Sequence, residues 1–159
     1  MSHTEFLAKV DVFGDLEQDQ LEKVADLMQE AEYDEDEVIF NEKAPGQHLF
    51  VVFAGVVEIY RDIEGDDRHV RLARLGPGEL FGELSLADGM PRSASARATI
   101  DPKTRLLVLS KTSLDELLGE NPILAVSFFR GLVRKLGERL RRVDDAVSDL
   151  SRALSYSWY

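Results

Sequence analysis

The sequence Phe81-Gly82-Glu83-Leu84-Ser85-Leu86, followed by Pro91-Arg92-Ser93-Ala94-Ser95-Ala96, decides the fold of this chain. Gly82 lacks a Cβ atom, so a ligand can approach the backbone closely, and residues 84–86 are predicted to begin a short helical turn with unpaired N–H groups. The guanidinium of Arg92 can donate two parallel hydrogen bonds to phosphate oxygens. The carboxylate of Glu83 can accept hydrogen bonds from sugar hydroxyls. Together the two segments predict a site for a ribose joined to a phosphate.

These segments resemble the phosphate-binding cassette of the cyclic-nucleotide-binding domain family, whose pattern is approximately F-G-E-hydrophobic-small-L and then P-R-small-A-small. The flanking sequence is also similar: residues 39–46, 49–52 and 55 resemble the family's early strands and turns, and residues 72–79 resemble the strand and loop before the cassette. Nearly the whole chain can be aligned with this pattern. One departure is Lys43, which stands where the family usually has a turn glycine, so we expect a turn of different shape before Gly46.

The resemblance implies a ligand and a set of site residues. The expected ligand is cAMP or cGMP, with no other cofactor and no metal. The residues expected to bind it are Phe81, Gly82, Glu83, Leu84, Ser85, Arg92, Ser93 and Ala94. In the family, the position after the arginine influences the choice of base, and a hydroxyl there can reach the phosphate or the amino group of a guanine. Ser93 therefore does not decide between the two nucleotides, and cAMP is only slightly favoured.

The chain is predicted to fold as one α+β domain, mainly β, over residues 1–159. A chain of 159 residues suits a single domain that buries about 70% of its unfolded surface. Apolar residues recur at helical spacing between Leu16 and Met28, so residues 1–32 are predicted to form an N-terminal helical segment. The acidic run that follows is interpreted as a solvated loop, and its members are Glu30, Glu32, Asp34, Glu35, Asp36 and Glu37.

Residues 36–110 are predicted to form a β jelly roll or sandwich that contains the cassette, residues 81–96. Short segments rich in β-branched residues are separated by turn residues, which is typical of an all-β architecture. The predicted strands cover residues 38–40, 49–53, 56–60, 70–75, 94–100 and 105–109.

Helices are predicted again over residues 112–155. Ser113 and Glu116 are predicted to form a capping box, and Asn121-Pro122 is predicted to begin a long last helix. Apolar residues of that helix alternate spacings of four and three, and we call this set the apolar seam: Phe129, Val133, Leu136, Leu140, Val143, Val147, Leu150 and Leu154. Such a heptad pattern predicts a parallel homodimer, in which Arg139 and Asp144, five residues apart, flank the shared core with opposite charges. The alternative is that the seam packs on the helix's own domain.

Composition and motifs argue against several classes of function. The net charge of −11 repels nucleic acid, and the absence of cysteine excludes disulfides and thiolate metal sites. No apolar run approaches the ~18 residues of a membrane span, and the N-terminus lacks a secretory signal. His3, His48 and His69 are far apart, and no triphosphate-binding loop or nucleophile elbow occurs. We therefore expect a cytoplasmic protein that is not an enzyme, holds no metal and binds neither nucleic acid nor a membrane.

Two classes of function remain open. In the first, the chain is a regulatory module that binds a cyclic purine nucleotide and transmits binding through its last helix to an unidentified effector protein. Only residues 155–159 follow Leu154, so no helix-turn-helix, kinase or channel domain is expected within this chain. The alternative is that the chain is a fragment of a longer protein. In the second, the chain is a dimerising interaction module whose cassette binds no nucleotide in the cell.

Overall fold

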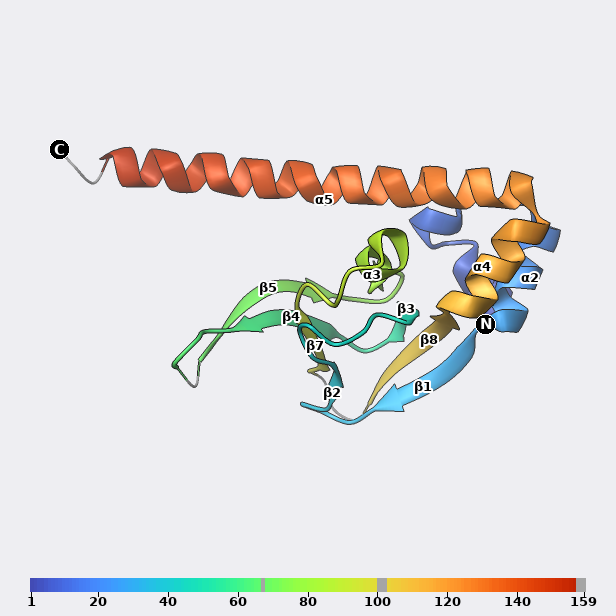
Figure 1. The fold of residues 1–159 in the computed structure, drawn as a ribbon, viewed down its shortest axis with the longest axis horizontal. Helices are drawn as coiled ribbons and strands as arrows, with labels where there is room; N and C mark the ends of the chain where they lie inside the picture. The colour runs from blue at the N-terminus through green and yellow to red at the C-terminus, as the bar shows by residue number, and fades with distance from the viewer. Residues whose placement is uncertain (67, 100–102, 157–159) are drawn as a thin grey trace.

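The chain forms a β sandwich with helices at its N-terminus and one long helix at its C-terminus (Figure 1). The structure is a computed structural model that describes residues 1–66, 68–99 and 103–156, without the side chains of residues 155 and 156. The helices are α1 (His3–Leu7), the 3₁₀-helix η1 (Asp11–Phe13), α2 (Gln18–Leu27), α3 (Glu83–Asp88), α4 (Lys111–Glu120) and α5 (Pro122–Tyr156). The strands are β1 (Gln29–Tyr33), β2 (Val38–Phe40), β3 (His48–Ala54), β4 (Val57–Asp62), β5 (His69–Leu75), β6 (Leu80–Phe81), β7 (Ser95–Ala98) and β8 (Thr104–Ser110).

The strands form two antiparallel four-stranded sheets, ordered β1-β8-β3-β6 and β2-β7-β4-β5. All six segments predicted as strands are strands, which confirms the sandwich fold. The predicted end of β7 at Ile100 lies outside the described residues. The sequence did not predict β1 or β6.

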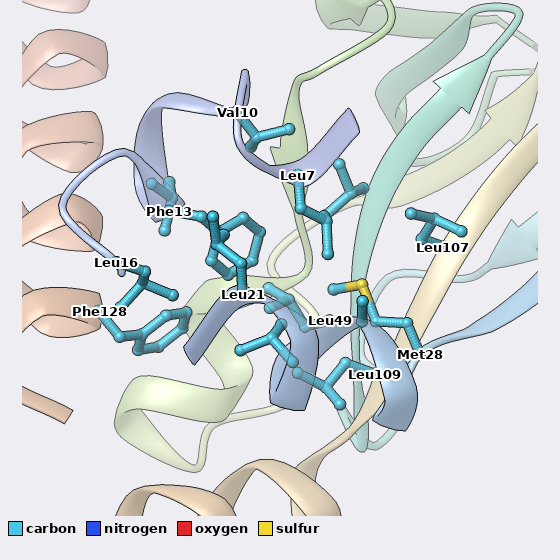
Figure 2. Close-up of a cluster of buried hydrophobic side chains, with 14 of the residues drawn as sticks. Leu7, Val10, Phe13, Leu16, Leu21, Met28, Leu49, Leu107, Leu109 and Phe128 are labelled. Carbon is cyan, nitrogen blue, oxygen red and sulfur yellow. The ribbon is translucent and has the colours of Figure 1, made fainter. Parts of the chain in front are cut away.

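The strands β3 and β8 are buried on both faces and separate two hydrophobic cores. Successive side chains of a strand point to opposite faces. Leu49 and Val51 of β3 accordingly lie in the core beneath the helices, whereas Phe50 and Val52 lie in the core between the sheets. In β8 the same alternation directs Leu107 to the helices and Leu106 to the facing sheet. In Figure 2, Leu49 and Leu109 lie among side chains from α1, η1, α2 and α5.

The N-terminal segment differs from its prediction. Residues 1–32 were expected to be helical, and the acidic residues after them were expected to form a loop, but Gln29–Tyr33 form the edge strand β1. Two of these acidic residues pair with cations on or beside the neighbouring strand: Glu30 lies 3.1 Å from Arg105, and Glu32 lies 3.1 Å from Lys103. The prediction was wrong because the strand that pairs with this segment, β8, is more than 70 positions away in the sequence.

The C-terminal helices begin near the predicted positions. Ser110, rather than Ser113, is the N-cap of α4, and its hydroxyl accepts a hydrogen bond from the backbone N–H of Ser113. The helix α5 starts at Pro122, as predicted, and contains 35 residues, so it is about 50 Å long at ~1.5 Å per residue. Within the described residues, no helix combines the length and the apolarity needed to cross a membrane.

The two halves of α5 have different surroundings. The first half packs on the domain through Leu124, Phe128 and Leu132, which are buried. In the second half, every described side chain from residue 141 onward is exposed, and in Figure 1 the end of α5 extends beyond the β4–β5 hairpin. Most of the apolar seam is therefore uncovered within one chain, with 57–68% exposure at Val133, Leu140, Val143, Val147, Leu150 and Leu154. Within the seam, Leu136 packs against the helix-side core, and the half-exposed ring of Phe129 contacts the core residue Phe128.

Gly131 permits the contact between α5 and η1, which yields a stability prediction. A Cβ atom at Gly131 would lie 2.1 Å from the carbonyl oxygen of Val12, a backbone atom that cannot move aside alone. We expect Gly131→Ala to lower the free energy of unfolding by about 1–3 kcal/mol, the usual cost of overpacking. Urea unfolding followed by circular dichroism would measure this change.

Gly119 of α4 is the matched control, because a Cβ atom there has no neighbour within 4 Å. Since alanine is favoured over glycine inside a helix, Gly119→Ala should raise the free energy of unfolding by up to about 1 kcal/mol. A Gly131→Ala variant as stable as the wild type would contradict the close approach of α5 to η1.

Candidate functional site

Gly82 joins β6 to α3 and sets the geometry of the predicted cassette. Its φ is 78°, in the left-handed region that glycine adopts at little cost. A Cβ atom at this position would lie 2.7 Å from Nη1 of Arg92 and 3.0 Å from the carbonyl oxygen of His48. The predicted helical turn is present as α3, with Glu83 as its first residue. Gly82 is thus required both for the turn and for the approach of Arg92.

Arg92 lies beneath this turn and is only 4% exposed. Its Nη1 donates to the carbonyl oxygen of Gly82 and its Nη2 to that of His48, each at 2.8 Å. The guanidinium carbon lies 4.2 Å from the centroid of the Phe40 ring. Burial lowers the pKa of Arg92 and the nearby Glu83 carboxylate raises it, with burial dominating; an arginine nevertheless stays charged.

One nitrogen of Arg92 has no partner. Its Nε is buried and makes no hydrogen bond to any described residue. A guanidinium has five N–H groups, so the two bonds above leave donors available. An unpaired buried donor is costly and rare in native proteins. Arg92 is therefore a desolvated cation with spare donors, which suits an anionic ligand.

Glu83 is the second charged group of the site and is 3% exposed. Its Oε1 accepts a short hydrogen bond from Nη1 of Arg139, which comes from α5, and Nη2 of Arg139 donates to the carbonyl oxygen of Leu80. Burial raises the pKa of Glu83, while the charges of Arg139 and Arg92 oppose this effect. The carboxylate that the sequence assigned to a sugar hydroxyl thus has a side chain of the last helix as its partner.

A cavity of about 340 Å³ opens between the cassette, β5 and α5, a size within the usual range of small-ligand sites. All eight residues predicted for the site line it: Phe81, Gly82, Glu83, Leu84, Ser85, Arg92, Ser93 and Ala94. The other lining residues are Phe40, Ile59, Leu72, Ala73, Arg74, Leu75, Glu79, Arg139, Arg142 and Val143. Four of the lining side chains are arginines and two are glutamates. The cavity therefore carries net positive charge in a chain whose net charge is −11, which favours an anion.

Sequence reasoning missed the walls of this cavity that lie outside the cassette. Arg139 was predicted only as a flanking charge of the heptad pattern, and its contact with Glu83 spans 56 positions. No local signal could have found Arg142, Val143, Arg74 or Leu72, because only the path of α5 past β5 and the cassette makes them neighbours. Ser93 is exposed, and its carbonyl oxygen accepts from Arg61 at 2.8 Å and 2.6 Å.

The turn at Lys43 does not differ as expected. Lys43 has φ of 68°, the left-handed conformation that glycine adopts readily. Its backbone N–H donates to the carbonyl oxygen of Arg92 at 2.8 Å. The turn therefore keeps the backbone conformation suited to glycine. Among the described residues, no group of three or more His, Cys, Asp or Glu side chains is arranged to hold a metal ion.

Comparison with known proteins shows similarity to one domain family. The sequence profile of the cyclic nucleotide-binding domain matches residues 30–121. The chain is 30% identical over 146 residues to a CRP-like cAMP-activated global transcriptional regulator of Mycobacterium tuberculosis, covering 92% of this chain and 62% of that protein. It is also 30% identical over 145 residues to the cGMP-dependent protein kinase egl-4 of Caenorhabditis briggsae, covering 88% of this chain and 19% of the kinase.

Solved structures give the same result. A cyclic nucleotide-binding domain from Methylobacillus flagellatus superposes with a TM-score of 0.79 at 31% identity, covering 92% of this chain and 80% of that one. The chain spans less than two thirds of the length of the regulator and of the kinase named above. The similarity to those two proteins is confined to one of their parts.

Proposed function

Because the chain belongs to the cyclic nucleotide-binding domain family, we propose that it is a regulatory module that binds a cyclic purine nucleotide in the cavity between cassette and α5. The observation that carries this proposal is the guanidinium of Arg92, which is buried in a positively charged cavity with an unpaired Nε. A module of this kind performs no reaction. No metal or further cofactor is needed, and the cytoplasmic location and the absence of nucleic-acid or membrane binding stay predictions from the sequence.

The ligand is assigned to the cavity by chemistry. The phosphate receives hydrogen bonds from Arg92 and from the first backbone amides of α3, at Leu84 and Ser85. The ribose hydroxyl donates to Glu83. The purine then extends toward the apolar part of the lining, which includes Ile59, Leu72 and Val143.

The sequence slightly favours cAMP, and cAMP is the ligand we propose first. The comparison with cGMP is essential, because Arg74 and Arg142 also line the cavity and can only donate. Guanine offers two acceptors, O6 and N7, on the edge where adenine offers one acceptor and one donor. Relatives named for each nucleotide occur among the proteins compared.

Transmission of the signal is proposed to run through α5. A ligand can shift a conformational equilibrium only through its different affinity for the two states. Arg139, Arg142 and Val143 of α5 contribute to the same cavity as the cassette, so a nucleotide there meets the helix directly. The effector protein that reads the helix is unidentified.

A parallel homodimer through α5 is proposed from the apolar seam. From Leu140 to Leu154 its members are all exposed and alternate spacings of three and four, and an exposed apolar stripe of this kind marks an interaction site. A second copy presents the complementary seam. The alternative function, a dimerising interaction module that binds no nucleotide, shares this surface and differs only in the cavity, so direct binding measurements distinguish the two.

The first test concerns the phosphate anchor. Titration calorimetry of the wild type with cAMP and with cGMP should reveal binding, and Arg92→Ala should weaken it at least tenfold, since a charge-assisted hydrogen bond contributes about 1.5–3 kcal/mol. The same substitution leaves two backbone carbonyls unpaired, so a lower melting temperature is expected and the titration is run well below it. Arg105→Ala, which removes an arginine paired with Glu30 on another face, is the control. Equal affinities of Arg92→Ala and the wild type would contradict the site.

The second test concerns the ribose. A 2′-deoxy analogue should bind the wild type more weakly than the parent nucleotide does, because it cannot donate to Glu83. The same analogue should lose little further affinity in Glu83→Ala, since the partner group is already absent. Glu83→Gln keeps one acceptor and should lie between the wild type and Glu83→Ala. If the losses from analogue and substitution simply add, Glu83 does not hold the hydroxyl.

The third test concerns assembly. Leu140→Asp combined with Val147→Asp would place four carboxylates in the shared core and should yield monomers by light scattering, while nucleotide affinity falls far less than with Arg92→Ala. Arg141→Asp with Ser148→Asp is the matched control, because these exposed residues follow the same heptad spacing one position away. A wild type that is monomeric at tens of micromolar would refute the dimer.

A further inference from the structure

We propose that Arg139 exchanges between two carboxylates, Glu83 of its own chain and Asp144 of a second copy, and that cyclic nucleotide drives this exchange. The proposal rests on the proposed function, since it concerns how ligand binding and pairing of α5 are coupled. It assigns Arg139 as the residue through which the cavity regulates assembly. Three features of the structure carry it.

The first feature is that Arg139 holds the carboxylate that the ligand requires. Its two terminal nitrogens donate to Oε1 of Glu83 and to the carbonyl oxygen of Leu80. Glu83 is 3% exposed, so its carboxylate cannot turn outward to serve a ligand elsewhere. A ribose hydroxyl that approaches Glu83 through the cavity therefore meets the guanidinium of Arg139 already in place.

The second feature is that Arg139 has another carboxylate within the heptad pattern. With Val133 and Leu140 at the first core position and Leu136 and Val143 at the second, Arg139 and Asp144 occupy the two flanking positions, five residues apart. In a parallel pair of helices these positions lie opposite each other and bring unlike charges together. Asp144 is exposed, and it makes no ion pair or hydrogen bond within the described part of the chain.

The third feature is that the two carboxylates lie in different surroundings, Glu83 buried in the cavity of its own chain and Asp144 exposed on α5, so the side chain of Arg139 can be directed toward only one of them at a time. While its two terminal nitrogens bond to Glu83 and Leu80, Asp144 of the partner subunit would lack its cation. When the nucleotide takes Glu83, Arg139 is released beside Leu140, at the edge of the apolar seam. Nucleotide binding and dimerisation therefore favour each other, and by linkage the factor is the same in both directions.

The first experiment measures competition at Glu83. If Arg139 must leave Glu83 before the nucleotide binds, Arg139→Gln should raise the affinity for cAMP and cGMP several-fold. The gain reaches about tenfold when Arg139 is away from Glu83 in only a tenth of the wild-type molecules. Arg141→Gln, an exposed arginine two positions away that does not line the cavity, should leave the affinity unchanged. An Arg139→Gln variant that binds nucleotide more weakly would overturn the proposal, because Arg139 would then hold the ligand instead of opposing it.

The second experiment measures the dimer by analytical ultracentrifugation. Saturating nucleotide should tighten the wild-type dimer several-fold, and this gain should disappear in Arg139→Gln and in Asp144→Asn. Asp145→Asn is the matched control, because its side chain lies on the outer face of the pair, and it should keep the gain. Reversing both charges, Arg139→Asp with Asp144→Arg, should restore a tight dimer whose dissociation constant no longer depends on nucleotide.

A third variant separates this proposal from the proposed function. Glu83→Gln weakens the intrachain pair without any ligand, so it should tighten the dimer even if neither nucleotide binds. If neither nucleotide binds the wild type, the proposed function is refuted. The dimer affinity of Glu83→Gln would still show whether Arg139 exchanges between Glu83 and Asp144. If nucleotide binds but no dimer forms, or if Glu83→Gln and nucleotide both leave the dimer unchanged, the exchange is refuted and nucleotide binding stands.

Discussion

The buried guanidinium of Arg92 is the interaction on which the site depends. Its two carbonyl bonds join the start of β3, at His48, to the turn at Gly82, and its contact with Phe40 adds the end of β2. Three segments from two sheets thus meet at one side chain. Because the group lies in a region of low dielectric constant, its charge acts strongly on its neighbours and on any anion that enters. Gly82 is required there because any Cβ atom would collide with this guanidinium.

Both charged groups of the proposed ligand site, Arg92 and Glu83, are buried. Glu83 is desolvated enough for its pKa to be raised, yet Arg139 and Arg92 act to keep it ionised. A ligand with one negative phosphate and a neighbouring hydroxyl matches Arg92 and Glu83 together, whereas an anion without the hydroxyl matches only one of them. The carboxylate of Glu83 interacts with Arg92 of the cassette and with Arg139 of α5. A ligand that binds Glu83 would therefore also change a contact of α5.

The helix α5 has one face packed on the domain and another that is largely exposed. Leu124, Phe128 and Leu132 pack on the domain, and Gly131 allows the helix backbone to approach η1. The apolar seam lies on another face, and most of it is exposed. Arg139 directly precedes the seam residue Leu140 in the sequence, and its side chain contacts Glu83 of the cassette. This geometry is the basis of the proposal that a single residue connects the cavity to assembly.

The sequence alone determined the helices, strands and motifs that depend on interactions between residues close together in the chain. Short segments rich in β-branched residues and separated by turn residues predicted six strands, Asn121-Pro122 predicted the start of α5, and the cassette motif predicted eight residues that line one cavity. Local patterns failed where the stabilising partner is distant. The strand β1 forms because its backbone pairs with β8, which lies more than 70 positions away, and the ion pairs of Glu30 and Glu32 accompany this pairing. The contact of Arg139 with Glu83 likewise depends on the path of a 35-residue helix across the cavity. Periodicity and turn-forming residues act between near neighbours in the chain, so the sequence shows them directly. Side chains more than 50 positions apart become neighbours only when the tertiary structure brings their elements together.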